Sequence, residues 1–252
     1  MSDTERKRLP VLPKYSADTA FLPTLEVLTS WAEIYELITT NPGLFAKELK
    51  GVNRDEYFKM LADRFPDLPI SLQLPKGDLS YLFEEAVKFS EIAPNIVVKV
   101  PMYCDDTLDS TTENGKTLKL ISRLSAKGIK TNVTALMNAQ QAIMSMRAGI
   151  SGGKEVDYVS LFFNRIKDGG GDPEREIQNL RAYIDKFGLS TQIIVGSIRD
   201  RNDVTQSEMA GAHIVTIPPK IIKSMVYDAQ SVIFIDQCQI DYELAFGPAS
   251  EK

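Results

Sequence analysis

Short apolar runs alternate with amphipathic segments along almost the whole chain. Most of the runs are rich in Val, Ile and Leu, which is typical of buried strands. Segments such as LSYLFEEAVKFSEI (79–92) carry apolar residues at i, i+3 and i+4, which is typical of helices. The pattern predicts strands at 14–18, 38–40, 69–74, 96–101, 130–134, 156–163, 191–197 and 212–217. It predicts helical segments at 25–37, 54–65, 79–92, 117–129, 135–149, 174–188 and 203–211.

Regular alternation of strands and helices over 252 residues favours a parallel sheet flanked by helices. It favours a closed (β/α)8 TIM barrel more than an open doubly wound sheet. Because no linker or shift in composition divides the chain, we expect a single α/β domain over residues 1–252, with a polar lead at 1–13. Residues 226–252 are predicted to form a C-terminal helix and tail that cover the barrel or pack on a neighbouring subunit.

Charge and composition narrow the partners and the location. The net charge of −5 and the pI near 5.1 argue against a nucleic-acid or membrane-surface partner, so we expect a small molecule in a local pocket. The chain start lacks an apolar segment, no run approaches membrane-spanning length, and Cys104 and Cys238 lack metal-ligand spacing; together these predict a reducing cytoplasmic location. The single histidine, His213, lies in a strand-like stretch where a structural role is expected, which excludes histidine triads and histidine-rich metal sites.

Polar side chains close the predicted strands. In a (β/α)8 barrel the chemistry takes place at the carboxyl ends of the strands, so these side chains should converge on one face. They are Asp18, Asn41, Gln73, Lys99, Asn132, Thr134, Ser160, Arg165, Ser197 and Arg199.

Lys99 is the most unusual of them because it interrupts the apolar run IVVKVP (96–101). A lysine in a strand can lie at a sheet edge or extend its amine to the surface. In a barrel strand, however, Val98 and Val100 would face the helices and Lys99 the interior. A partly desolvated lysine has a lowered pKa and a neutral amine able to attack a carbonyl, so this position predicts a Schiff base.

Seven motifs follow one another along the chain: ADTA (17–20), TTNP (39–42), VVKVP (97–101), GIKTNVTALMNAQQA (128–142), YVSLFFNRIKD (158–168), GSIR (196–199) and AHIVTIPPKI (212–221). In order and spacing they resemble the transaldolases, specifically the short branch that includes fructose-6-phosphate aldolase. The resemblance covers about residues 14–247. No single motif is decisive, but their placement at consecutive barrel strands is highly specific.

The resemblance implies a set of catalytic roles. Lys99 stands where the family has its Schiff-base lysine, and Asp18 matches the acid that handles the substrate hydroxyl proton. Thr134 and Gln73 match the two partners of a catalytic water. The chemistry implied needs no metal and no organic cofactor.

Further positions match residues that bind the substrate. The amides of Asn41 and Asn132 would bind hydroxyls of the three-carbon unit, and Ser160 and Phe162 would line the donor site.

The resemblance also implies a phosphate pocket. Two guanidinium groups and a hydroxyl complement a tetrahedral dianion, and they would come from Arg165, Arg199 and Ser197. The alternative for the two arginines is a surface ion pair with Asp168 or Asp200.

Three positions point to different reactions. Gln73 resembles fructose-6-phosphate aldolase, since typical transaldolases have glutamate there, and it favours aldol cleavage. Phe162 and Asn132 resemble the transaldolases instead and favour group transfer. We therefore expect transfer of a dihydroxyacetone unit from a ketose phosphate to an aldose acceptor. A lyase that releases free dihydroxyacetone and a non-catalytic sugar-phosphate binding barrel are the alternatives.

One segment departs from the family. The link MYCDDTLDSTTENG (102–115) is several residues longer than usual, so it either reshapes the acceptor site or is a solvated insertion. The expected partners are small-molecule sugar phosphates. The resemblance and the apolar C-terminal helix also imply a homo-oligomer.

Overall fold

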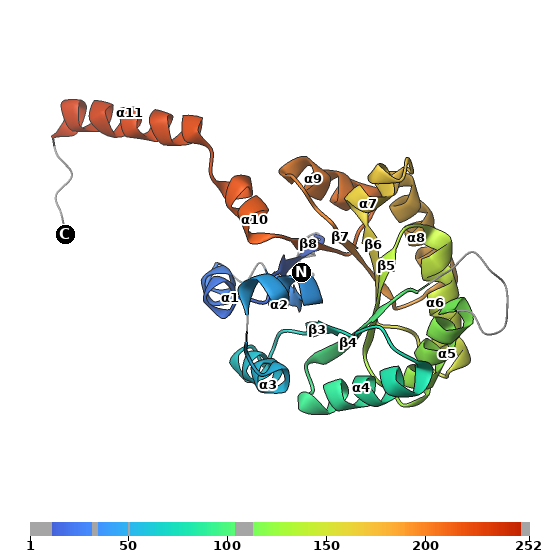
Figure 1. Ribbon diagram of the computed structural model, residues 1–252. Helices are drawn as coiled ribbons and strands as arrows, with labels where there is room; N and C mark the ends of the chain where they lie inside the picture. Colours follow the sequence, from blue (N-terminus) through green and yellow to red (C-terminus); the bar gives the residue numbers. More distant parts are fainter. Residues whose placement is uncertain (1–11, 32–34, 50, 104–112, 248–252) are drawn as a thin grey trace, which may run out of the picture.

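Eight short strands pair in chain order into a closed parallel barrel (Figure 1). The computed structural model describes residues 12–31, 35–49, 51–103 and 113–247. The predicted (β/α)8 barrel is confirmed and the open sheet is wrong, because β1 pairs with β8 as well as with β2. The strands are β1 (Lys14–Asp18), β2 (Tyr35–Thr39), β3 (Ile70–Gln73), β4 (Ile96–Pro101), β5 (Thr131–Leu136), β6 (Tyr158–Phe162), β7 (Gln192–Gly196) and β8 (Ile214–Ile217).

Helices surround the barrel, and most begin at a polar residue whose side chain accepts a backbone N–H of the first turn. Two of them, α8 and α9, end at glycines in the left-handed conformation, Gly188 and Gly211. The helices are α1 (Leu22–Thr29), α2 (Pro42–Glu48), α3 (Arg54–Arg64), α4 (Leu79–Ile92), α5 (Glu113–Ala126), α6 (Ala139–Ser151), α7 (Phe163–Asp168), α8 (Pro173–Phe187), α9 (Arg201–Ala210), α10 (Pro219–Val226) and α11 (Ala229–Phe246).

The second strand begins earlier than its sequence pattern predicts. The segment 25–37 was expected to be helical, but α1 ends at Thr29 and β2 starts at Tyr35. Leu37 pairs with Ser16 of β1 and packs with Ile194 and Ile214 inside the barrel. Tertiary pairing therefore decides the conformation of an apolar stretch whose periodicity fits a helix equally well.

The apolar residues form two separate clusters. The larger lies between the barrel and the helices and includes Val98 and Val100 of β4, as the alternation in IVVKVP predicts. The smaller consists of Leu37, Ile194 and Ile214, against which Tyr158 packs. Nearer the carboxyl ends of the strands the interior side chains become polar. The barrel interior is therefore apolar around Leu37, Ile194 and Ile214 and polar at its carboxyl end.

The C-terminal helix does not cover the barrel. Figure 1 shows α11 extending away from the other helices, and none of its residues is buried. The extended backbone of Tyr227 and Asp228 separates α11 from α10 and directs it outward. The prediction that this helix covers the barrel is thus wrong for this chain, and the helix begins at Ala229 rather than at 226. No helix in the described part of the chain is long and apolar enough to cross a membrane.

Candidate active site at the carboxyl ends of the strands

Three of the expected site residues form a row across neighbouring strands. Lys99 of β4 lies opposite Gln73 of β3 on one side and Asn132 of β5 on the other. Residues that face each other across paired strands point to the same side of the sheet. Since Val98 and Val100 contact the helices, the row of Gln73, Lys99 and Asn132 faces the barrel interior.

The Lys99 side chain is buried, with 5% of its surface exposed. Its Nζ donates a hydrogen bond to the backbone carbonyl of Thr40 at 3.0 Å. Burial lowers the pKa of Lys99 from 10.5. The nearby negative charge of Asp18 raises this pKa, but its effect is smaller than that of burial. The net lowering increases the fraction of neutral amine, which is the nucleophilic form of lysine.

Asp18 ends β1, and its carboxylate is oriented by a hydroxyl of the neighbouring strand β2. Its Oδ1 accepts a hydrogen bond from the Thr39 hydroxyl of β2 at 3.1 Å. The Thr39 hydroxyl is also hydrogen-bonded to the hydroxyl of Thr216 in β8. The carboxylate is thereby oriented by a chain of two hydroxyl groups.

The Asn132 amide is fixed at both ends within the interior. Its Oδ1 accepts from the Ser160 hydroxyl at 2.7 Å, and its Nδ2 donates to the Ser71 hydroxyl at 3.2 Å. Both Asn132 and Ser160 are buried, so the structure places these two expected residues in direct contact.

Thr134 is buried near the end of β5, opposite Pro101. Among the described residues its hydroxyl has no hydrogen-bond partner, which is uncommon for a buried polar group. The following residue, Ala135, has a φ of +61°, and the pairing register between β5 and β6 shifts there. Such irregularities at a strand end re-aim side chains, and here the irregularity adjoins an unsatisfied hydroxyl.

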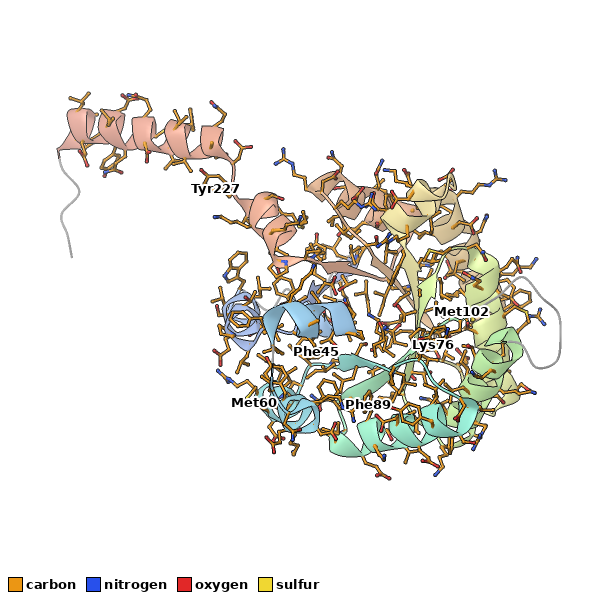
Figure 2. All side chains as sticks on the ribbon, in the orientation of Figure 1. Phe45, Met60, Lys76, Phe89, Met102 and Tyr227 are labelled. Atoms are coloured by element: carbon orange, nitrogen blue, oxygen red, sulfur yellow. The ribbon has the colours of Figure 1, made fainter. Side chains whose placement is uncertain are left out.

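Asn41 and Gln73 lie where α2 and β3 reach the same end of the barrel. The Asn41 side chain caps α2 by accepting the Leu44 N–H at 3.1 Å. A cavity of about 220 Å³ beside Gln73 is lined by apolar rings, two of which, Phe45 and Phe89, are labelled in Figure 2. Arg54 also lines this cavity and stacks over the Phe89 ring at 5.1 Å.

The three residues expected to bind phosphate come from the segments that follow β6 and β7. Arg165 was expected at the end of the sixth strand but lies on α7, where it is exposed. Ser197 follows β7 with a φ of +62°, a left-handed conformation that is uncommon for a residue with a side chain. Arg199 donates to both carboxylate oxygens of Asp168, so the alternative ion pair is present for Arg199.

Phe162 ends β6, and its half-buried ring lies beside Gly196 of β7. A Cβ added at Gly196 would be 3.9 Å from the Phe162 ring and 3.1 Å from the Thr216 methyl group. Glycine at this position lets both side chains approach β7 closely.

Several polar residues of the interior were not anticipated. Thr39, Ser71 and Thr216 hold the expected side chains, although none of them was singled out from the sequence. The alternation of side chains along a strand could have identified them as facing the interior. Thr39 and Thr216 each lie two positions after an inward-facing apolar residue, and Ser71 lies two positions before Gln73.

Other predicted features lie outside this site or outside the described residues. His213 accepts the Ile193 N–H on its Nδ1 at 3.0 Å, which fits the structural role expected for it. Cys104 and most of the 102–115 segment fall outside the described residues.

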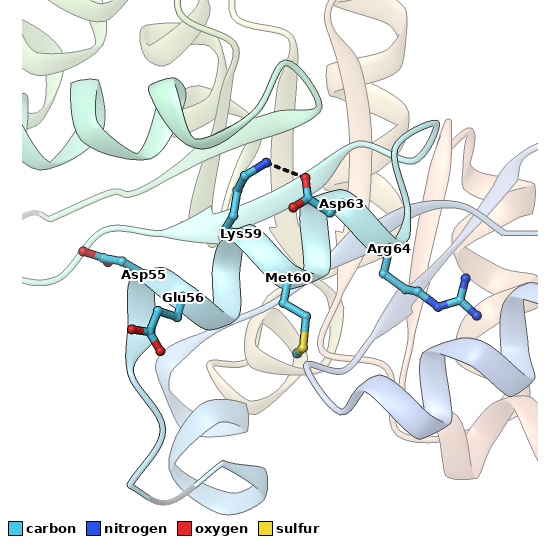
Figure 3. A pocket seen from close by; sticks show the side chains of 6 residues that line it. All are labelled: Asp55, Glu56, Lys59, Met60, Asp63 and Arg64. Carbon is cyan, nitrogen blue, oxygen red and sulfur yellow. Dashed lines mark hydrogen bonds and ion pairs between the residues drawn. The ribbon is translucent and has the colours of Figure 1, made fainter.

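In the described ranges no three His, Cys, Asp or Glu residues are grouped as a metal site. A surface hollow lies along α3 (Figure 3), and it is lined by Asp55, Glu56, Lys59, Met60, Asp63 and Arg64.

Comparison with known sequences identifies relatives along almost the whole chain. The sequence pattern of the family described as Transaldolase/Fructose-6-phosphate aldolase matches residues 15–243. A "Probable transaldolase" of Symbiobacterium thermophilum is 34% identical over 236 residues, which cover 93% of this chain and 99% of that protein. A "Probable transaldolase" of Desulforamulus reducens is 39% identical over 188 residues, which cover 75% of this chain and 78% of that protein.

Similarity to solved structures concerns the fold alone. The structure described as "Native KDPGal structure" aligns with a TM-score of 0.53 at 11% sequence identity and covers 88% of this chain and 87% of that one. A designed cube-shaped protein cage, built by fusing symmetric oligomeric domains, aligns with a TM-score of 0.54 at 11% identity and covers 94% of this chain and 80% of that one. Both are consistent with the barrel seen here.

Proposed function

Because the chain belongs to the Transaldolase/Fructose-6-phosphate aldolase family, we propose that it transfers a dihydroxyacetone unit from a ketose phosphate to an aldose acceptor. The transfer proceeds through a Schiff base on Lys99. The observation that carries this proposal is the buried Lys99 amine, with its lowered pKa, in the interior row between Gln73 and Asn132. A sugar-binding barrel without catalysis needs no such amine.

In the first half of the reaction, the neutral Lys99 amine attacks the ketose carbonyl carbon, and loss of water with uptake of one proton from the solvent leaves a protonated imine. Asp18 accepts the proton of the hydroxyl on the fourth carbon as the bond between the third and fourth carbons breaks. An aldehyde departs, and the electron pair of the broken bond remains on the three-carbon unit as an enamine. The hydrogen bond from Thr39 supports this role, because it orients the Asp18 carboxylate.

In the second half, the enamine carbon attacks the carbonyl carbon of the acceptor aldehyde. Asp18 returns its proton to the new alkoxide, and water then releases the product ketose and regenerates the Lys99 amine. We assign the water to Thr134 and Gln73. The Thr134 hydroxyl, unsatisfied within the described part of the chain, supports this assignment because a water in contact with it would supply the missing partner.

The remaining interior residues are assigned to the bound sugar. Asn41, Asn132 and Ser160 would bind hydroxyls of the three-carbon unit, with Phe162 beside them. The two hydrogen bonds that fix the Asn132 amide support this role, since a preorganised amide loses little freedom when the sugar binds. Arg165, Ser197 and Arg199 would hold the phosphate group, and the imine chemistry itself needs neither metal nor organic cofactor.

The lyase that releases free dihydroxyacetone is the second candidate, and Gln73 is the observation that favours it. Glutamine keeps a hydrogen bond to the catalytic water but carries no titratable proton. Product formation from fructose 6-phosphate, with and without erythrose 4-phosphate, separates the two reactions. We expect product only with the acceptor; free dihydroxyacetone without it would establish the lyase instead.

Imine formation is tested by borohydride reduction in the presence of dihydroxyacetone or fructose 6-phosphate, followed by mass spectrometry of the protein. We expect one adduct on Lys99. The Lys99→Ala variant should form no adduct and lose turnover, while Lys130→Met, which changes an exposed lysine just before β5 at the opposite end of the barrel, should keep both. Absence of an adduct on the unmodified chain would favour a binding barrel over an enzyme.

We further propose that the protein is a cytoplasmic homo-oligomer in which α11 packs on a second copy. No residue of α11 is buried, and it exposes Val232, Ile233, Phe234, Ile235, Ile240, Tyr242, Leu244 and Phe246. Monomeric proteins rarely leave an apolar surface of this extent in water. Light scattering should show a smaller species for Phe234→Asp than for the matched polar change Gln239→Asp. An unchanged mass would contradict packing through α11.

A further inference from the structure

The proposed anion pocket is assembled from two loops. Arg165 lies on α7 after β6, whereas Ser197 and Arg199 follow β7. An anion that contacts both loops requires a constant distance between them, because a shift of about 1 Å is enough to weaken a preorganised site. Two buried side chains, Asn164 and Asp203, connect the loops and have no role in the proposed chemistry.

Asn164 joins α7 to the residues that follow β7. Its Nδ2 donates to the Ser197 carbonyl at 2.8 Å and to Oδ2 of Asp203 at 2.6 Å. The backbone N–H of Asn164 also donates to the Ser197 carbonyl, at 3.4 Å. Arg165 is the next residue along the chain, so these bonds tie the Arg165 helix to the Ser197 turn.

Asp203 makes more contacts than a helix cap requires. Its Oδ2 accepts from Asn164 and also from the backbone N–H groups of Arg199 at 2.8 Å and Asp200 at 3.2 Å. Its other oxygen lies 3.8 Å from the Lys167 ammonium. Only the contact with Asp200 belongs to the capping box at the start of α9. The contacts to Asn164 and Arg199 reach outside that helix.

The backbone that these bonds hold is an unfavourable one. Ser197 has a φ of +62°, and L-residues avoid this region because Cβ crowds the backbone. Such conformations persist only where the surroundings over-determine them. Here the Ser197 carbonyl accepts twice from Asn164, and the backbone of Arg199 is held by Asp203.

We propose that Asn164 and Asp203 are positioning residues for the anion pocket, which hold the Ser197 turn and the Arg165 helix at a separation that fits a phosphate group. The inference rests on the proposed function for the identity of the anion. It does not depend on the imine at Lys99, so the two can fail separately.

Electrostatics and positioning predict opposite outcomes for one substitution. Asp203→Asn removes a negative charge near the pocket, which by itself would tighten the binding of a phosphate dianion. It also turns the charged acceptor of three N–H groups into a weaker, neutral amide oxygen and sets an NH2 donor against the Lys167 ammonium, which loosens the bonds that hold the Ser197 turn. Weaker phosphate binding in this variant is therefore a signature of lost positioning.

The experiment measures two quantities on the full chain: the dissociation constant of inorganic phosphate by titration calorimetry, and KM and kcat with fructose 6-phosphate. For Asp203→Asn and for Asn164→Ala we expect phosphate to bind about tenfold more weakly and KM to rise by a similar factor. We expect kcat to stay within about threefold and borohydride trapping with unphosphorylated dihydroxyacetone to be unchanged.

Asp200→Ala is the matched control. It removes the side chain that caps the same helix, α9, and a negative charge next to Arg199, without touching Asn164 or Ser197, so phosphate binding should stay unchanged or become tighter. The proposal is overturned if phosphate binding is unchanged or tighter in both test variants, or if Asp200→Ala weakens it equally. Failure of unmodified protein to bind phosphate would overturn it too. Loss of the Lys99 adduct with phosphate binding intact would instead count against the proposed function. Should Asp203→Asn not fold, Asn164→Ala decides.

Discussion

Thr39 donates a hydrogen bond to the Asp18 carboxylate at 3.1 Å, and the hydroxyl of Thr216 lies against that of Thr39 in turn. Thr39 has a single hydroxyl proton, and that proton points to Asp18. Thr216 is consequently the donor in the second bond. Thr216 of β8 therefore fixes the β2 hydroxyl that orients the carboxylate proposed to move the substrate proton.

Thr39→Val should lower kcat while leaving imine formation at Lys99 intact. A hydrogen bond to a charged group contributes about 1.5–3 kcal/mol, so its loss should slow turnover about tenfold or more. Steady-state kinetics and borohydride trapping measure the two effects. Thr191→Val is the control, because Thr191 is equally buried but donates to the Val156 carbonyl on the far side of the barrel. Equal losses in the two variants would contradict the role of Thr39.

Asp18→Asn should shift the pH dependence of imine formation. Burial lowers the pKa of Lys99, and the charge of Asp18 partly offsets that effect. Removing the Asp18 charge should therefore lower the pKa of Lys99 further. A neutral amine would then be available at lower pH. The acidic limb of the rate of adduct formation should therefore move to lower pH, even though turnover falls. A limb that stays in place or moves upward would show that the two groups do not interact.

Lys99→Met should stabilise the protein most at low and neutral pH. In the unfolded chain Lys99 has its ordinary pKa of 10.5, and in the folded protein burial lowers that pKa. At any pH between the lowered pKa and 10.5, the unfolded chain therefore binds more protons than the folded one. Stability of the unmodified protein accordingly rises with pH across this window. At neutral pH we expect Lys99→Met to raise the Tm by about 2–4 °C for each kcal/mol of unfolding free energy that it adds. This gain in Tm should shrink as the pH approaches 10.5.

The control for that series is Lys130→Met. Lys130 also donates to a backbone carbonyl, that of Pro94 at 3.0 Å, but its side chain is exposed. The Tm difference of this variant should be independent of pH. If the Tm gain changed with pH in the same way in both variants, burial of the Lys99 amine could not be its cause.

Asp168→Asn should tighten phosphate binding without changing the Tm. The ion pair of Asp168 with Arg199 is exposed on both sides, and such pairs contribute little to stability. Removing one negative charge beside Arg199 should strengthen inorganic phosphate binding about two- to fivefold at low salt, and added salt should abolish the gain. Asp185→Asn, in the exposed pair with Arg181 elsewhere on the surface, should have no effect. Weaker phosphate binding would mean that Asp168 positions Arg199.

Much of the barrel could be predicted because its strands and helices have distinct periods. IVVKVP was expected as a strand with Lys99 turned inward, and β4 has these bounds and this orientation. The stretch that contains Leu37 was expected to be helical, since a short apolar segment fits both periods. Pairing of β2 with β1 decides it.

Contacts between distant residues could not be predicted in the same way. The Arg199 side chain was expected in a phosphate pocket, with an ion pair as the alternative, and the geometry of α7 brings Asp168 against it. Asn164 and Asp203 were not anticipated at all, because neither strand periodicity nor a motif links these residues of two separate helices, α7 and α9. Only the folded chain shows that they meet.

By itself, the sequence determined the order of the elements, the inward position of Lys99 and the end of the barrel where polar residues gather, because these follow from local periodicity and from strand direction. The tertiary structure alone decided which hydroxyl orients Asp18, how Ser197 is held and where α11 points. Those features depend on contacts between residues far apart in the chain, and on the two extended residues before α11 that direct it away from the barrel.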